Sequence, residues 1–249
     1  MKKFRGSALV ASAAAFALTI TGCAATDELS PTTSPSESAA TTEWYEDLAP
    51  QITVGWNDII DTFNTSSAAG NNVGNSLTAY LTSSGFNYYD SAPALVKNTE
   101  FGSYEIVVED PLTVKYTIND GVVWSDGTAI DGADMLLAWV ATFGYYKNED
   151  GSYVFAHAAP KDTLASKLPT VDGNSITFEY DVQYVDWELQ FGVGVSAHGT
   201  VMMAHEDITD AAAAKQALID AVMNGDDAFM ADVATVWNEG YSFTNTPDN

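Results

Sequence analysis

The residues that could do chemistry in this sequence are concentrated between Gly194 and His205. The run Gly194 to His198 contains Gly-x-Ser, but a histidine stands where the nucleophile elbow of hydrolases needs its second glycine for a sharp turn. His198 and His205 are seven residues apart, rather than the four that place two imidazoles on one helical face to bind zinc. We therefore expect no catalytic residue and no metal ligand here, and interpret both histidines as structural.

Other sites for ions or cofactors are also not predicted. The acidic turn at Asn148 to Gly151 has its glycine too early for the spacing of a calcium-binding EF-hand. No strand is followed by a Gly-x-Gly-x-x-Gly or Walker loop that could cradle phosphates. The sequence thus predicts a protein without a cofactor and without enzymatic activity.

Cys23 is the one cysteine of the chain, and its position indicates export and lipidation. Three cations, Lys2, Lys3 and Arg5, precede an apolar run over residues 8–20 that is too short to span a bilayer. The run ends in Ile-Thr-Gly-Cys, which resembles the lipobox of bacterial lipoproteins. The resemblance implies cleavage after a signal peptide, residues 1–22, and attachment of lipid to Cys23. The alternative is a buried structural thiol.

The charge balance excludes one class of partner. Lys and Arg number 9 against 34 Asp and Glu, which gives a formal net charge of -25. So acidic a chain cannot bind nucleic acid by neutralising phosphates. Its hydrophobic content of 46% nevertheless predicts a packed globular domain rather than a disordered acidic chain.

The domain boundary is predicted from a change of composition. Residues 23–50 are rich in Ala, Thr, Ser and Pro and lack a periodic apolar pattern, as expected for a disordered linker after the lipidated cysteine. Folded structure is expected over residues 51–249, and it should begin with a strand at Ile-Thr-Val-Gly-Trp, residues 52–56.

Within this domain the pattern alternates between strands and helices. Residues 104–108 and 113–118 predict a strand pair, and residues 175–180 predict a further strand. A helix from Asp131 to about Tyr145 should present one apolar face to a sheet. Two more helices are expected near the end of the sequence, over residues 211–223 and 227–237.

Residues 113–139 carry a resemblance to a known family. The run TVKYTINDGVVWSDGTAIDGADMLLAW resembles the signature segment of the extracellular solute-binding proteins of family 5, the peptide-binding components of ABC importers. In physical terms the segment is structural: Trp124 should pack beneath a tight turn, Gly127 should allow the chain to reverse, and Asp131 or Thr128 should cap the following helix.

The resemblance implies a fold and a function. The fold is α/β, the first lobe of a two-lobed periplasmic-binding-protein-like fold (type II, peptide-binding class) with a mixed sheet and flanking helices. Family members are longer, so the second lobe is expected to be absent from residues 51–249. The function implied is that of a monomeric solute-binding lipoprotein, anchored by lipid to the extracytoplasmic face of the bacterial membrane. It would deliver an oligopeptide or a similar small solute to ABC permease subunits.

The resemblance also suggests residues that contact the ligand. It points to Trp56 and Asn57 after the opening strand, and to Tyr153 and Phe155 after the signature helix. Core packing is the ordinary alternative for each aromatic side chain. For the whole protein, the alternatives are a surface lipoprotein with a structural or interaction role and, least favoured, a hydrolase that uses Ser196 or His198.

Overall fold

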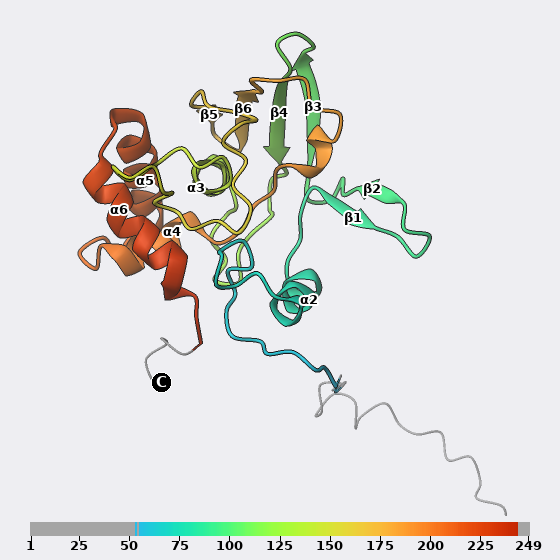
Figure 1. Ribbon diagram of the computed structural model, residues 1–249, viewed down its shortest axis with the longest axis horizontal. Coiled ribbons are helices and arrows are strands. Elements are labelled where there is room, and N and C mark those ends of the chain that lie inside the picture. Colours follow the sequence, from blue (N-terminus) through green and yellow to red (C-terminus); the bar gives the residue numbers. More distant parts are fainter. Residues whose placement is uncertain (1–52, 54, 244–249) are drawn as a thin grey trace, which may run out of the picture. The chain divides into compact units, whose positions relative to one another are not determined.

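The computed structural model describes residue 53 and residues 55–243, and all its helices and strands lie in the unit Gly55–Asn249 (Figure 1). The main sheet has four antiparallel strands in the order β3-β4-β6-β5. These strands are β3 (Gly102–Val108), β4 (Thr113–Ile118), β5 (Thr170–Asp172) and β6 (Ser175–Glu179). A separate hairpin pairs β1 (Asn87–Tyr89) with β2 (Leu95–Lys97).

The central strand β4 shows how the alternation of side chains builds the core. Val114, Tyr116 and Ile118 are fully buried, whereas the residues between them are half-buried. Tyr116 lies opposite Ile176 of β6, and its ring stacks on Phe178 with 5.9 Å between ring centroids. Aromatic and branched side chains therefore cover one face of the sheet, as a half-buried antiparallel sheet requires.

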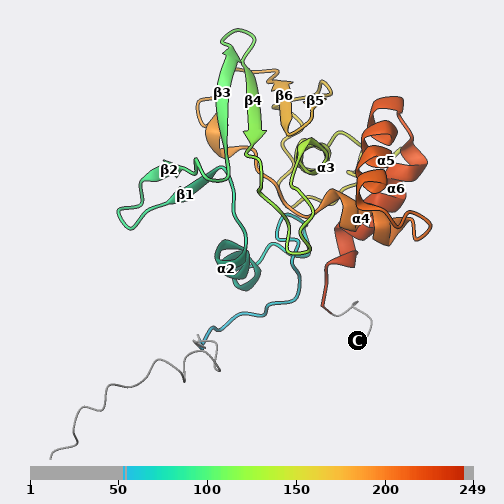
Figure 2. The same ribbon diagram turned by 180° about the vertical axis from the view of Figure 1, so that it is seen from behind.

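Helix α3 (Gly132–Thr142) packs against that sheet and against the helices on its other side. Figures 1 and 2 show α4 (Ala197–Ala204), α5 (Ala211–Asn224) and α6 (Asp227–Thr235) side by side, with α3 between them and strands β5 and β6. The remaining elements are α2 (Val73–Thr82), a short 3-10 helix (Trp187–Leu189) and a π-helical turn (Val236–Gly240).

Most predicted elements are confirmed. The strand pair, the strand at residues 175–180 and the helices near residues 131, 211 and 227 are all present as β3, β4, β6, α3, α5 and α6. The turn before α3 also has the predicted construction, because Gly127 has a φ of +88° and the Asp131 side chain accepts a hydrogen bond from the Ala133 N–H. The mixed α/β class is thus confirmed.

Four details differ from the prediction. The strand pairs described are all antiparallel, whereas the family resemblance implied a mixed sheet. Thr53, Gly55 and Trp56 are not in a strand, while Ile52 and Val54 lie outside the described residues. Helix α3 is buried on all sides from residue 132 to residue 141 instead of on one face, because helices as well as the sheet cover it. It ends three residues early, before Gly144, whose φ of +58° is left-handed and stops the helix.

Candidate functional site

Two neighbouring cavities are the candidate site. The larger, with a volume of about 540 Å³, is called the Trp124 cavity, and the smaller, of about 450 Å³, is called the Lys161 cavity. Val193 and Gly194 line both of them. Each cavity has the size of a site for a small molecule.

The Trp124 cavity brings together segments that are distant in sequence. Its walls come from α2, from the turn at residues 122–126, and from the chain that leads into α4. Ala79, Thr82 and Val195 contribute to a lining that is more apolar than polar, and Ser125, Asp126 and His198 supply polar groups. Such a combination of apolar wall and few polar groups is typical of a binding site for a small ligand.

Asp126 and His198 form a pair on this wall. The Oδ2 atom of Asp126 lies 2.8 Å from Nε2 of His198, and the histidine is 5% exposed. The pKa of the Asp126 carboxyl is lowered to about 2, first by the hydrogen bond from the Thr128 N–H and second by the hydrogen bond from His198. The group is therefore ionised at neutral pH. The Nδ1 atom of His198 is buried and has no hydrogen-bond partner within the described residues.

A buried carboxylate holds the elements around the Trp124 cavity together. Asp134 is fully buried at the start of α3 and accepts a hydrogen bond of 3.1 Å from Nε1 of Trp124. It also accepts hydrogen bonds from the backbone N–H groups of Asp131 and Ala197, and its Oδ2 lies 2.7 Å from Nζ of Lys215. The turn that carries Trp124, the start of α4 and helix α5 are thereby fixed to α3.

The Lys161 cavity contains a cation and an aromatic stack. Nζ of Lys161 donates to the carbonyl of Gln190 at 2.8 Å, and burial lowers the lysine's pKa. The His157 ring stacks on Trp237 with 6.2 Å between centroids, and its Nδ1 accepts a hydrogen bond from the Ala159 N–H. Burial, and then the nearby Lys161, lowers the pKa of His157, because both disfavour a positive charge on the ring.

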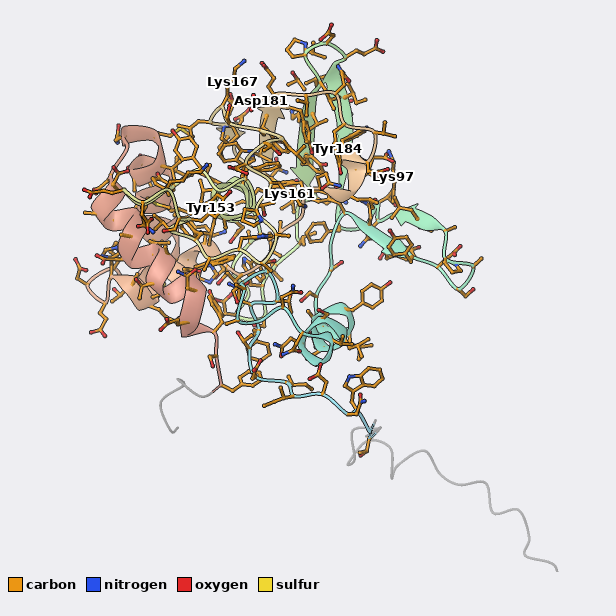
Figure 3. The ribbon with its side chains drawn as sticks, viewed as in Figure 1. Lys97, Tyr153, Lys161, Lys167, Asp181 and Tyr184 are labelled. Atoms are coloured by element: carbon orange, nitrogen blue, oxygen red, sulfur yellow. The ribbon has the colours of Figure 1, made fainter. Side chains whose placement is uncertain are left out.

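The four ligand contacts predicted from the sequence are not brought together, and none lines either cavity. Trp56 and Asn57 are exposed. The Tyr153 ring lies against the Lys147 ammonium, with 5.1 Å between Nζ and the ring centroid. Figure 3 labels Tyr153 and also Lys161, which follows it on the same loop. Phe155 is only 1% exposed and packs on Trp237 and Tyr146, so its place is in the core.

Sequence reasoning missed the Asp126–His198 pair, because 72 residues separate its members. Ser196, the residue that could act with His198 in hydrolysis, has no side-chain hydrogen bond to that histidine. Among residues 53 and 55–243, no cluster of His, Cys, Asp and Glu could hold a metal ion. None of the helices described in this range has both the length and the apolar character needed to cross a bilayer. Cys23 lies outside the described residues.

Comparison with known proteins finds binding proteins and lipoproteins. No family model matches the chain. It is 27% identical over 187 residues to the oligopeptide-binding protein OppA of Mycobacterium tuberculosis, a match that covers 70% of this chain and 31% of OppA. It is also 26% identical to a lipoprotein of Mycobacterium leprae over 206 residues, which are 81% of this chain and 34% of that protein. A lipoprotein of Mycobacterium tuberculosis is 30% identical over 104 residues, which are 42% of this chain and 19% of the relative.

A solved structure, the periplasmic EDTA-binding protein EppA, matches with a TM-score of 0.49 and 24% identity, over 64% of this chain and 28% of that one. The chain thus spans about a third, or less, of the length of the curated relatives that it matches. By its name, OppA is an oligopeptide-binding protein.

Proposed function

We propose that this protein is an extracytoplasmic solute-binding lipoprotein of an ABC importer, which binds an oligopeptide or a similar small solute for delivery to membrane permease subunits. The observation that carries the proposal is the similarity to OppA over 70% of the chain. The similarity to mycobacterial lipoproteins agrees with the lipobox-like sequence that ends in Cys23. Residues 55–243 would form one lobe of the binding protein, and the protein would act as a monomer held to the membrane by its lipid.

The two cavities support a binding role for this part of the chain. They offer apolar walls for side chains, together with a carboxylate at Asp126 and an ammonium at Lys161. These groups can orient a solute that carries both amino and carboxyl groups.

The proposal is tested by thermal unfolding of the full chain with and without a millimolar mixture of di- to pentapeptides. A ligand that binds the folded state raises the unfolding midpoint by mass action. A tryptophan at Thr82, which lines the Trp124 cavity, should reduce the shift.

The matched control is Ser76→Trp. Ser76 is also exposed on α2, and it makes the same type of side-chain hydrogen bond, to the carbonyl four residues earlier, but it lies outside both cavities. Thr82→Trp should diminish the peptide-induced shift while Ser76→Trp retains it. A midpoint that no peptide moves would contradict the proposed function.

Lipid attachment is tested separately. The full chain expressed in a bacterium with lipoprotein-processing enzymes should partition into the membrane fraction and incorporate a labelled fatty acid, and Cys23→Ser should abolish both. Incorporation of label that persists in the Cys23→Ser variant would contradict lipidation at this residue.

The second candidate function is that of a surface lipoprotein with a structural or interaction role, and a specific observation favours it. Helix α2 buries only Gly74 and Asn75, while Leu81 is 82% exposed. Large apolar side chains before this helix, such as Ile59 at 62%, are exposed as well. Apolar residues in such number on a surface mark an interaction site. This role predicts a folded chain that peptides do not stabilise.

A further inference from the structure

Helix α2 presents two different faces to its surroundings. Ala79 and Thr82, on one face, line the Trp124 cavity. The opposite face is apolar and exposed, and its side chains have the spacing of an apolar stripe on an α-helix. Its members are Val73, Leu77, Tyr80 and Leu81. Such a stripe ordinarily packs against a partner, but within the described residues none of these side chains is buried or lines either cavity.

Neighbouring segments lie at both ends of this stripe. At the start of α2, the carbonyl oxygen of Ile59 is so close to Gly74 that a Cβ atom on this glycine would be 2.4 Å from it, and the Ile59 side chain is exposed. Toward the other end, the Tyr80 hydroxyl accepts a hydrogen bond of 3.3 Å from the Tyr89 N–H, which ties α2 to the β1–β2 hairpin beside it in Figures 1 and 2. The exposed side chains of Ile59, Val73, Leu77, Tyr80 and Leu81 are here called the α2 face.

Most of the α2 face belongs to an uncharged part of a very acidic chain. Residues 62–89 contain no Asp, Glu, Lys, Arg or His, although the whole sequence has 34 acidic residues. The acidic residues that border this stretch are already hydrogen-bonded, since Asp61 accepts from the Asn75 side chain at 2.7 Å and Asp90 accepts from the Ala92 N–H at 2.8 Å. A charged partner is recognised by opposite charges, so the α2 face suits an uncharged and apolar partner.

The size and the position of the α2 face favour a lipid bilayer over a second copy of the chain. A stable protein interface takes about 20–30 residues from each partner, which is far more than this face offers. An amphipathic helix that lies in a membrane surface needs only one apolar stripe. In addition, Ile59 follows Cys23, the residue expected to carry lipid, by 36 residues. A lipid anchor this near in the sequence would hold the α2 face at a high effective concentration beside a membrane.

We propose that the α2 face is a membrane-contact surface, with α2 parallel to the bilayer and with Leu77 and Leu81 at the boundary between headgroups and acyl chains. Leucine and tyrosine are typical residues of such interfacial positions. The contact is apolar, because a chain with a formal net charge of -25 is repelled by anionic headgroups. This inference goes beyond the proposed function, since it concerns the face of α2 opposite the Trp124 cavity and requires no solute.

The test places a single fluorophore on the α2 face of the full chain. Cys23→Ser removes the one native cysteine, so Leu77→Cys or Met223→Cys then supplies one thiol for an environment-sensitive label. The two positions are matched, because both lie on helices and are 41% and 43% exposed, but Met223 is on α5. On phosphatidylcholine vesicles, the emission of the label at residue 77 should shift to the blue and be quenched by brominated acyl chains. The label at residue 223 should show neither change, and any contact of residues 1–52 with the vesicles is common to both chains.

A second substitution in the chain labelled at residue 77 tests the apolar character of the contact. Leu81→Glu puts a charge on the α2 face and should raise the lipid concentration that gives half of the blue shift by about tenfold or more. Val185→Glu is the control, since Val185 is 94% exposed and Leu81 82%, but Val185 lies outside the α2 face. It should leave this concentration within about twofold of the original value. Circular dichroism should be unchanged in both variants.

Three results would overturn the membrane contact. The first is an equal response of the labels at residues 77 and 223, and the second is no response of the label at residue 77 at millimolar lipid. The third is a blue shift that grows with protein concentration without lipid, together with a dimer in analytical ultracentrifugation, which would assign the α2 face to a second copy.

The proposed function is separable from this inference. Leu81 lines neither cavity, so Leu81→Glu should retain the peptide-induced rise of the unfolding midpoint. Failure of the membrane contact would therefore leave peptide binding standing, and a midpoint that no peptide moves would leave the membrane contact standing.

Discussion

Asp134 and Lys215 form a buried ion pair that joins α3 to α5, with 2.7 Å between Oδ2 and Nζ. Their side chains are 0% and 8% exposed. The same carboxylate accepts hydrogen bonds from Trp124 and from the backbone of Ala197, both at the border of the Trp124 cavity. One side chain thus holds the turn of Trp124, the start of α4 and helix α5 in place.

Loss of the cation should therefore destabilise the whole domain. Lys215→Met retains much of the side-chain volume but leaves the Asp134 carboxylate buried without its ion-pair partner. Removing one member of a buried pair costs about 3–5 kcal/mol, because the remaining charge is no longer compensated. The free energy of unfolding in urea should fall by about that amount.

Lys97→Met is the control for this prediction. Lys97 pairs with Glu188 at 3.3 Å, and its side chain is 58% exposed. Exposed pairs contribute little, so the loss should stay below about 1 kcal/mol. Equal losses in the two variants would show that burial does not decide the effect.

The parts of the site that could be predicted from the sequence are those built by neighbours in the chain. Between Trp124 and Asp131, a turn, a glycine with positive φ and a helix cap follow one another, and each is determined by residues a few positions away. The resemblance of residues 113–139 to a family segment depended on this same local order.

The rest depends on contacts between distant residues. Nothing near Asp126 in the sequence indicates that His198 will lie 2.8 Å from it. Complete burial of α3 likewise follows from helices that come later in the chain. Glycine alternates with apolar residues from Phe191 to Val195, but only the structure shows that this stretch lies between two cavities.

Acid should release the Asp126–His198 pair in a defined pH range. The pKa of Asp126 is lowered from 3.8 to about 2 in the folded chain, so the unfolded state binds the proton first as the pH falls. The stabilisation is therefore complete above about pH 4 and is lost as the pH falls toward 2.

The thermal midpoints of wild type and Asp126→Asn, measured from pH 5 to pH 2, check this prediction. The wild type should lose more stability than the variant over this range, since asparagine does not titrate. A constant difference between the two midpoints would contradict the lowered pKa.

His157 should also destabilise the fold as the pH falls, but near neutrality. Burial and Lys161 hold its pKa below 6.5 in the folded chain, so the unfolded state takes up a proton first. Stability is then highest above pH 6.5 and decreases as the pH falls through the folded pKa. An NMR titration of the ring should show a midpoint below 6.5, and His157→Gln should remove part of the decrease in thermal stability. A midpoint above 6.5 would contradict the burial of this ring beside Lys161.

Substitutions at two of the predicted ligand contacts should separate a role in packing from a role in binding. Phe155→Ala removes a ring that is 1% exposed and packs on Trp237, so the free energy of unfolding should fall by about 3–5 kcal/mol. Trp56 is 53% exposed, and Trp56→Ala should change the stability by only about 0.5 kcal/mol. Since Trp56 lines neither cavity, the shift of the unfolding midpoint produced by the peptide mixture should also stay close to the wild-type shift. Loss of this shift in Trp56→Ala, with the fold intact, would instead place the ligand at the start of the domain, as the family resemblance suggests, and not in the two cavities.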